Sequence, residues 1–136
     1  MTVFEEMVEV PFFFSGPGVP AKVEARRCNT VSLMNTLARV LSISPELNWE
    51  GEDLLHAGAE QPQFGYTDSS TATGDIVATC VVRDNLKLVV DSHFGNPLLF
   101  DLANDPGETT NLAGTRPADV ADLTALLTAH NSAVTK

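Results

Sequence analysis

The chain has 136 residues, of which 43% are hydrophobic and 19% charged, a composition typical of a folded domain with a buried core. It carries 8 Lys and Arg against 18 Asp and Glu, and the net charge of −10 argues against binding to nucleic acid or to an anionic membrane, because both need a basic face. No apolar run approaches the roughly 20 residues that cross a bilayer.

The first predicted element is a strand over residues 8–14, which are dense in β-forming residues and are followed by a Gly/Pro loop at 15–20. Its three consecutive Phe residues do not alternate with polar ones, so both faces of the strand should be covered. That pattern is typical of an inner strand in a helix-flanked parallel sheet.

A helix is predicted over residues 30–43, with Asn29 or Thr30 as its cap and Pro45 just beyond its end. Its apolar residues recur at steps of three to four positions: Val31, Met34, Leu37 or Ala38, and Leu41. Residues 44–75 are predicted to be loop.

An antiparallel meander follows, with strands at 76–83, 86–91 and 97–101. Asp84 and Asn85 tolerate positive φ and therefore suit a two-residue hairpin turn.

The segment Asp105-Pro106-Gly107-Glu108 predicts a turn in which Gly107 takes the positive-φ position. The last element is a helix from about Pro117 to Asn131. The order of elements predicts an α/β tail over residues 1–60 and an α+β C-terminal subdomain over residues 61–136. The tail has one strand and one helix, and the subdomain is a small antiparallel sheet with a C-terminal helix.

The first charged residue is Glu5, where a secretory signal would carry Lys or Arg. The sequence therefore predicts no signal peptide, and a cytoplasmic protein if Met1 is the true start. Two cysteines are too few for a disulfide framework, and the sequence favours two reduced thiols, Cys28 and Cys80, over one bridge.

The sequence shows no pattern of catalytic or metal-binding residues. His56, His93 and His130 lack the paired spacing of metal ligands. The acidic stretch at 101–108 fails the calcium-loop pattern, because Ala103 stands where an oxygen ligand belongs. From its residues alone the chain is an acidic, soluble domain with no visible active centre.

Several segments nevertheless resemble one enzyme family. Residues 99–113, LFDLANDPGETTNLA, closely resemble the signature LYDLENDPGETTNLA at the end of sulfatases, in the alkaline-phosphatase-like superfamily. Residues 81–88 are similar to the family's hairpin VRDGRYKYI, and residues 1–11 to its segment MTFYEESVRVPLI. Residues 15–19 resemble its GPGV loop, and residues 31–35 the start of its helix VSLVDLAPTLLDLAGI. These segments follow the family order over essentially the whole chain.

The resemblance implies an enzyme that hydrolyses sulfuric esters with formylglycine, made from Cys or Ser in a C/S-x-P/A-x-R motif, and a calcium or magnesium ion. Neither Cys28 nor Cys80 stands in such a motif, and the metal-binding Asp-His-Gly segment is missing. The resemblance therefore covers the C-terminal portion only: a strand and helix from an incomplete alkaline-phosphatase-like core, then the small sheet and helix. This portion is expected to be inactive alone and to need an upstream sulfatase catalytic core as its partner.

In the family a substrate-contacting Lys commonly precedes the Met-Thr of the first segment. The resemblance therefore implies that Phe4 and Glu5 lie near the rim of the substrate site, and it assigns no catalytic or metal-binding residue to this chain. The alternatives are a non-catalytic structural or binding module derived from a sulfatase, and a phosphodiesterase or phosphatase of the same superfamily.

Overall fold

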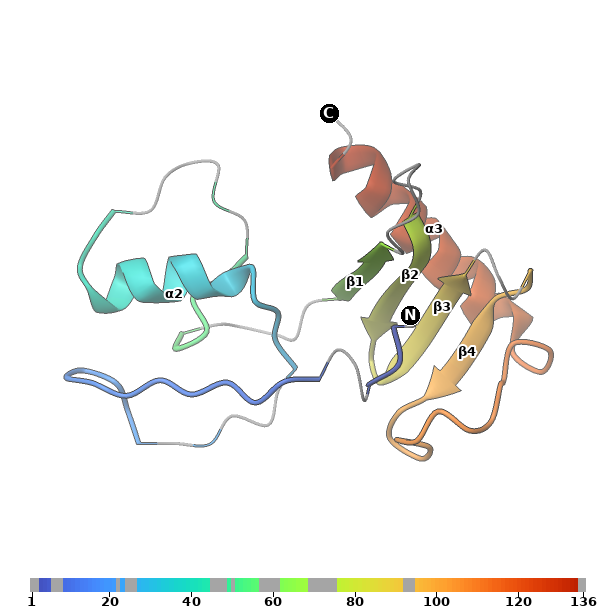
Figure 1. Cartoon of the computed structure of the whole chain (residues 1–136), viewed down its shortest axis with the longest axis horizontal. Coiled ribbons are helices and arrows are strands. Elements are labelled where there is room, and N and C mark those ends of the chain that lie inside the picture. Colours follow the sequence, from blue (N-terminus) through green and yellow to red (C-terminus); the bar gives the residue numbers. More distant parts are fainter. Residues whose placement is uncertain are drawn as a thin grey trace. The chain divides into compact units, whose positions relative to one another are not determined.

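The computed structural model describes residues 3–5, 9–21, 23, 27–44, 49, 51–56, 62–68, 76–91 and 95–134. The chain forms two compact units, which we call the sheet unit (Met1–Val10 with Phe64–Lys136) and the helix unit (Pro11–Gln63). Figure 1 shows their elements, which are α2 (Ser32–Val40), β1 (Gln63–Asp68), β2 (Ile76–Arg83), β3 (Leu86–Asp91), β4 (Leu98–Asp101) and α3 (Pro117–Val134).

The four strands form one sheet in the order β1-β2-β3-β4. β2 and β3 are antiparallel and joined by the predicted hairpin turn, in which Asp84 and Asn85 have φ values of 50° and 63°. β4 pairs antiparallel with β3 and begins just after Pro97. The predicted antiparallel meander and the C-terminal helix are therefore confirmed.

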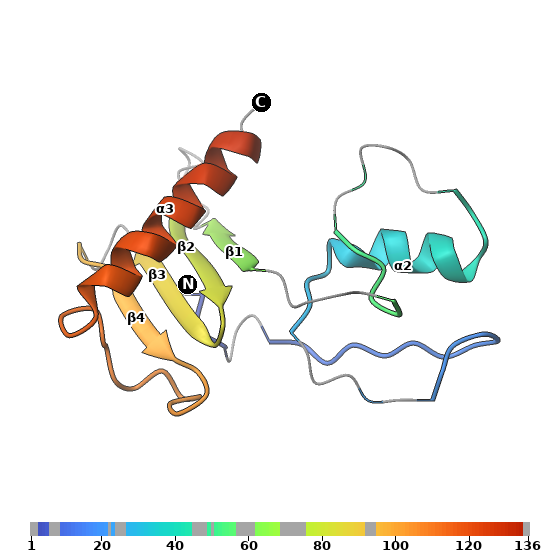
Figure 2. The ribbon, with the colours of Figure 1, turned by 180° about the vertical axis from the view of Figure 1, so that it is seen from behind.

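Each face of the sheet has its own covering layer. On one face α3 lies across the strands (Figure 2), and its Leu123 and Leu127 pack against one set of buried strand residues: Val81, Leu88 and Leu99. On the other face the N-terminal residues Val3 and Phe4 pack against the alternate set: Ala78, Cys80, Val82, Val89 and Phe100. This division follows from the period of two along a strand, which sends successive side chains to opposite faces.

The predicted strand at 8–14 is not formed by its described residues, 9–14, and residue 8 lies outside the described residues. A strand needs a neighbouring strand to receive its backbone hydrogen bonds, and no described segment pairs with this one. The expected covering of its faces also fails within this chain, since Phe13 is 86% exposed.

Two further predictions at the level of elements are corrected. The region 44–75 is not all loop, because it contains β1. In β1 the aromatic residues Phe64 and Tyr66 alternate with polar or small ones, a period-two pattern that the prediction overlooked. In the turn at 105–108 the residue with positive φ is Glu108, at 52°, and not Gly107. The Glu108 carboxylate is buried in the sheet unit, 3.0 Å from the Lys87 ammonium.

α2 turns small side chains inward and apolar ones outward. Ser32, Thr36 and Ala38 are buried, whereas Val31 and Met34 at the start of the predicted apolar stripe are about half exposed. The N-cap position of α2 is Val31, which makes no side-chain cap bond. The predicted capping contact is nevertheless made by Asn29, whose Oδ1 accepts the N–H of Ser32, the first residue of α2, at 3.1 Å.

The inward face of α2 is held by a loop that follows it in the chain. The Ser32 hydroxyl accepts the Glu52 N–H at 3.1 Å, and the Thr36 hydroxyl accepts the Leu54 N–H at 3.0 Å. Gly51 has a φ of 85° and approaches the Ser32 backbone closely. Polar contacts therefore help to hold α2 to the loop at 51–54.

Within the described residues, no helix has the length and apolar character needed to span a membrane. Cys80 is buried in the sheet unit, Cys28 is exposed, and neither forms a disulfide. The predicted assignment of residues 1–60 to the end of an α/β core stays a prediction.

Candidate functional site

The two residues expected near a substrate-site rim, Phe4 and Glu5, belong to the N-terminal segment 3–5. The Phe4 ring meets the Phe100 ring edge to face, with centroids 5.8 Å apart and an interplanar angle of 70°. Glu5 is buried, with 8% of its surface exposed. The sheet thus holds both side chains, and their place at a rim stays a prediction.

Glu5 belongs to a buried group of three charges, which we call the Lys87 cluster. The Lys87 ammonium donates to Glu5 Oε1 at 2.9 Å and lies 3.0 Å from Glu108 Oε1. The Glu5 backbone N–H donates to the other oxygen of the Glu108 carboxylate, Oε2. Lys87 is fully buried, and the carboxylate side chains of Glu5 and Glu108 are only 11% and 4% exposed.

The strand pattern explains why a lysine is buried here. On β3 the residues Lys87, Val89 and Asp91 share one face by alternation, and the N-terminal segment 3–5 covers that face. The burial of Lys87 was not predicted from the sequence. The available signal was the sequence of β3, LKLVVD, in which both alternating sets of residues contain apolar side chains. Both faces of such a strand should be covered, and a covered ammonium needs carboxylate partners.

The signature segment 99–113 builds its own turns with carboxylates. The carboxylate of Asp105 accepts the Thr109 hydroxyl at 2.9 Å and the Thr110 N–H at 2.8 Å. These bonds, that of the Thr110 amide above all, lower the pKa of Asp105. The pKa of Asp101 is likewise lowered, chiefly because its carboxylate accepts a hydrogen bond from the Asn104 side chain.

The same segment is tied back to β4. Asn111 Oδ1 accepts the N–H groups of Leu99 and Ala113 at 3.0 and 2.9 Å, and the Leu112 N–H donates to the Leu99 carbonyl at 2.8 Å. The polar residues of the signature therefore form turns and hold strand β4, which agrees with the turn that the sequence predicted at 105–108.

The Lys87 cluster joins three of the segments that carry the family resemblance. Glu5 comes from residues 1–11, Lys87 from residues 81–88, and Glu108 from residues 99–113. Glu5 and Glu108, which are 82 and 21 positions from Lys87 in the sequence, thus meet it at one buried place.

The histidines take no part in this cluster where the structure describes them. His56 Nδ1 lies 2.9 Å from Asp53 Oδ2, and the Arg39 guanidinium lies 3.7 Å from the same oxygen. The Asp53 side chain also accepts the Leu55 N–H, so this exposed group stabilises the turn at 53–56. His130 is half-buried on α3, and His93 lies outside the described residues.

The described part of the chain offers no resident metal site. Among the residues that the structure describes, no three His, Cys, Asp or Glu side chains come together in a way that could hold a metal ion.

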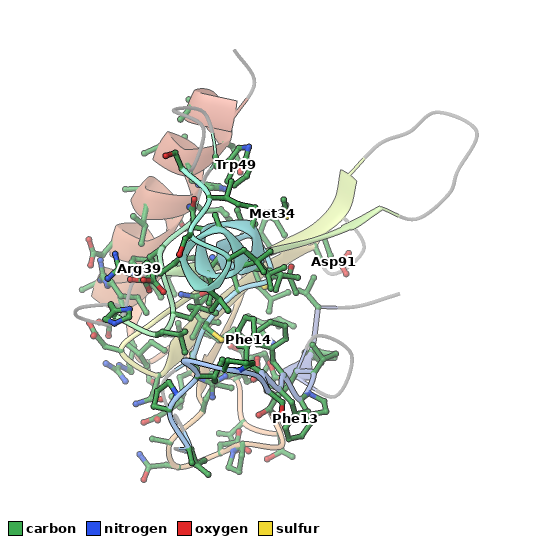
Figure 3. All side chains as sticks on the ribbon, turned by 90° about the vertical axis from the view of Figure 1, so that its left-hand side faces the viewer. Phe13, Phe14, Met34, Arg39, Trp49 and Asp91 are labelled. Atoms are coloured by element: carbon green, nitrogen blue, oxygen red, sulfur yellow. The ribbon has the colours of Figure 1, made fainter. Side chains whose placement is uncertain are left out.

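Large exposed apolar side chains concentrate in one part of the chain. Among the described residues, all of them except Val90 lie between positions 10 and 43: Val10, Phe12, Phe13, Val23, Val31, Met34, Leu41 and Ile43. Figure 3 marks Phe13 on the segment before α2 and Met34 on α2 itself. We call this set the exposed apolar residues.

No protein-family model and no curated protein matches the sequence significantly. Solved structures do match. One is a Bacteroides thetaiotaomicron protein assigned as a sulfatase, with a TM-score of 0.84 and 22% identity over 97% of this chain and 31% of that one. Another, from work on glycosaminoglycan metabolism in the same organism and designated a sulfatase, has a TM-score of 0.54 and 20% identity over 74% of this chain and 24% of that one.

At these identities the matches establish the fold. The predicted resemblance to sulfatases is confirmed at that level, and the chain spans about a third of the length of the first of these proteins and a quarter of the second.

Proposed function

We propose that this chain is the C-terminal part of a sulfatase-like hydrolase. In this proposal it contributes to sulfuric ester hydrolysis only together with a catalytic core supplied by an upstream polypeptide. The fold match over 97% of the chain, to 31% of a protein assigned as a sulfatase, is the observation that carries the proposal. The three segments that meet at the Lys87 cluster supply independent support, because they are those in which the sequence resembles the family.

The residues of this chain do not fit the reactive groups that a sulfatase requires. Formylglycine forms in a C/S-x-P/A-x-R motif, and neither Cys28 nor Cys80 stands in one. The described residues likewise bring together no carboxylate group suited to calcium or magnesium. Metal-assisted ester hydrolysis needs the nucleophile and the ion at one place, so we assign both to the upstream core.

The exposed apolar residues support a large partner protein. Removing apolar surface from water is worth about 25 cal/mol per Å². Phe13 alone is 86% exposed, and α2 presents Met34 and Leu41 outward while it buries serine and threonine. A catalytic core is the partner that we assign, because the remaining two thirds of a sulfatase would lie outside this chain.

Within the complete hydrolase we propose that Phe4 and Glu5 lie at the rim of the substrate site. Their segment is the first described part of the chain that packs on the sheet. Their side chains are held by Phe100 and Lys87, so in this proposal the two residues support the rim and do not themselves contact the substrate.

A non-catalytic binding module is the second candidate. The sheet unit favours it, because α3 covers one face of the sheet and the segment 3–5 packs on the other, so this unit has its own core. Expression of the chain alone separates the candidates. A monomer that melts cooperatively in both units favours the module, whereas aggregation that depends on Phe13 favours the C-terminal part of a larger enzyme.

The reading frame upstream of the codon for Met1 tests the proposal. We expect an Asp-His-Gly segment and a C/S-x-P/A-x-R motif there, in frame or in an adjacent gene. Unrelated coding sequence both in the upstream frame and in the adjacent genes would contradict the proposed function.

A further inference from the structure

We infer that Lys87 and Glu108 are positioning residues, which fix the N-terminal segment 3–5 on the sheet and thereby place the rim of the substrate site in the complete hydrolase. The effect on the substrate site rests on the proposed function. The fixing of the segment does not, because it follows from contacts within the sheet unit.

The Lys87 cluster holds Glu5 at two different points. The Lys87 ammonium binds the Glu5 side chain at 2.9 Å, and the Glu108 carboxylate accepts the Glu5 backbone N–H. One contact fixes the side chain and the other the backbone. Together they define both the position and the direction of the chain at residue 5.

Burial makes this arrangement specific. A buried charge is tolerated only when it is paired and hydrogen-bonded, so the alternative positions of the segment would leave carboxylates or the ammonium unpaired. Lys87 has no exposed surface, and its carboxylate partners retain 11% and 4%. Water therefore cannot replace Glu5 without opening the sheet unit.

The residue that makes the contacts with Lys87 and the Glu5 amide, Glu108, has an unfavourable backbone conformation. Glu108 has a φ of 52°, a left-handed conformation that L residues with long side chains rarely adopt. Gly107, immediately before it, would adopt that conformation without strain. The turn instead has its left-handed residue at Glu108, whose carboxylate contacts the Lys87 ammonium and the Glu5 amide. An unfavourable conformation at a residue with buried contacts suggests that those contacts matter to the structure.

Glu5 is also the last point that the cluster holds before the chain leaves the sheet unit at Val10. Its carbonyl accepts the Glu9 N–H at 2.8 Å. Residue 5 is therefore held at its side chain, its amide and its carbonyl.

Amide hydrogen exchange on the full chain tests the inference with the variants Glu108→Gln and Lys87→Met. Both neighbours of the Glu108 carboxylate, the Glu5 amide and the Lys87 ammonium, are donors, so either orientation of a glutamine side chain sets its NH2 group against a donor and loosens the cluster. We expect exchange at the Glu5 amide to accelerate about tenfold or more in Glu108→Gln, while amides of β2 and β3 keep their protection. Unchanged protection of the Glu5 amide in a folded Glu108→Gln variant would overturn the inference.

Lys87→Met and Arg83→Gln complete the series. Lys87→Met should release the segment to a greater extent, and if it does not fold, the Glu108→Gln result decides alone. Arg83→Gln is the matched control, because Arg83 pairs with Asp122 of α3, on the face of the sheet opposite to the one that segment 3–5 covers. It should leave the Glu5 amide unchanged, and an equal acceleration there would show that any lost cation loosens the segment.

The link to the substrate site is tested in the complete hydrolase assembled with the upstream polypeptide, with 4-nitrocatechol sulfate as the probe. Measured at a temperature where the variant is fully folded, Glu108→Gln should raise KM several-fold, and an unchanged KM would overturn the rim assignment. If the upstream polypeptide proves not to be a sulfatase core, the proposed function fails while the exchange result still decides whether Lys87 and Glu108 fix the segment.

Discussion

A methyl group at Gly51 should detach the loop at 51–54 from α2. A Cβ atom there would lie 2.6 Å from Ser32 Cα and 2.7 Å from Ser32 N, which are backbone atoms that cannot rotate away. Gly51 also has a φ of 85°, in the region that alanine avoids. Gly51→Ala therefore opposes both the local conformation and the close approach of the loop to the helix.

The contacts that the substitution puts at risk set the size of the effect. Three hydrogen bonds between described residues join the loop to α2. On the helix side, Asn35 Nδ2 donates to the Gly51 carbonyl at 2.9 Å. On the loop side, the Glu52 and Leu54 amides donate to the hydroxyls of Ser32 and Thr36. Each contributes about 0.5–1.5 kcal/mol, and the positive φ costs an alanine about 1–2 kcal/mol. Loss of the three bonds together with the cost of the positive φ destabilises the loop–helix contact by about 2.5–6.5 kcal/mol.

Hydrogen exchange of peptides that cover α2 and residues 51–56 measures this effect. We expect Gly51→Ala to lose protection in both peptides while β2 and β3 are unaffected. Gly114→Ala is the matched control, since a Cβ there meets no atom within 4 Å. Protection in Gly51→Ala equal to that in the unsubstituted chain would refute the contact geometry on which the reasoning depends.

Three further predictions concern the sheet unit and the whole chain. Leu99→Ala should lower the free energy of unfolding by about 3–5 kcal/mol in urea denaturation, because Leu99 is fully buried between β3 and α3, and a loss below 1 kcal/mol would contradict that packing. The pKa of Asp105 is lower in the folded chain than the unfolded value of about 3.9, so its contribution to stability is present above that pH and lost as pH falls through the folded pKa. Acid unfolding below about pH 4 should therefore depend less on pH in Asp105→Asn, and an unchanged acid limb would count against this. The isolated chain should hydrolyse no aryl sulfate with or without calcium, whereas turnover that a chelator abolishes would show a complete active site.

The sequence predicted best the elements that neighbouring residues determine. The Asp84-Asn85 turn and the strands beside it depend on local backbone preferences and on pairing across two residues, and both strands have the predicted bounds. The capping contact of Asn29 was equally local.

The elements that were missed depend on distant partners. Residues 8–14 have the composition of a strand, but a strand forms only beside another strand, and the described chain supplies none. The burial of Lys87 depends on carboxylates 82 and 21 positions away in the sequence, which no local pattern reveals. The outward apolar face of α2 was predicted as a stripe, but its exposure could be seen only in the structure.

Isolation of the native protein from its source, with an antibody against residues 99–113, tests the central claim most directly. Mass spectrometry of the purified material should find these residues joined to, or bound by, a polypeptide with formylglycine in a C/S-x-P/A-x-R motif, and sulfatase activity should co-purify with it. A chain recovered by itself as a stable monomer, or bound only to polypeptides without that residue, would contradict the account.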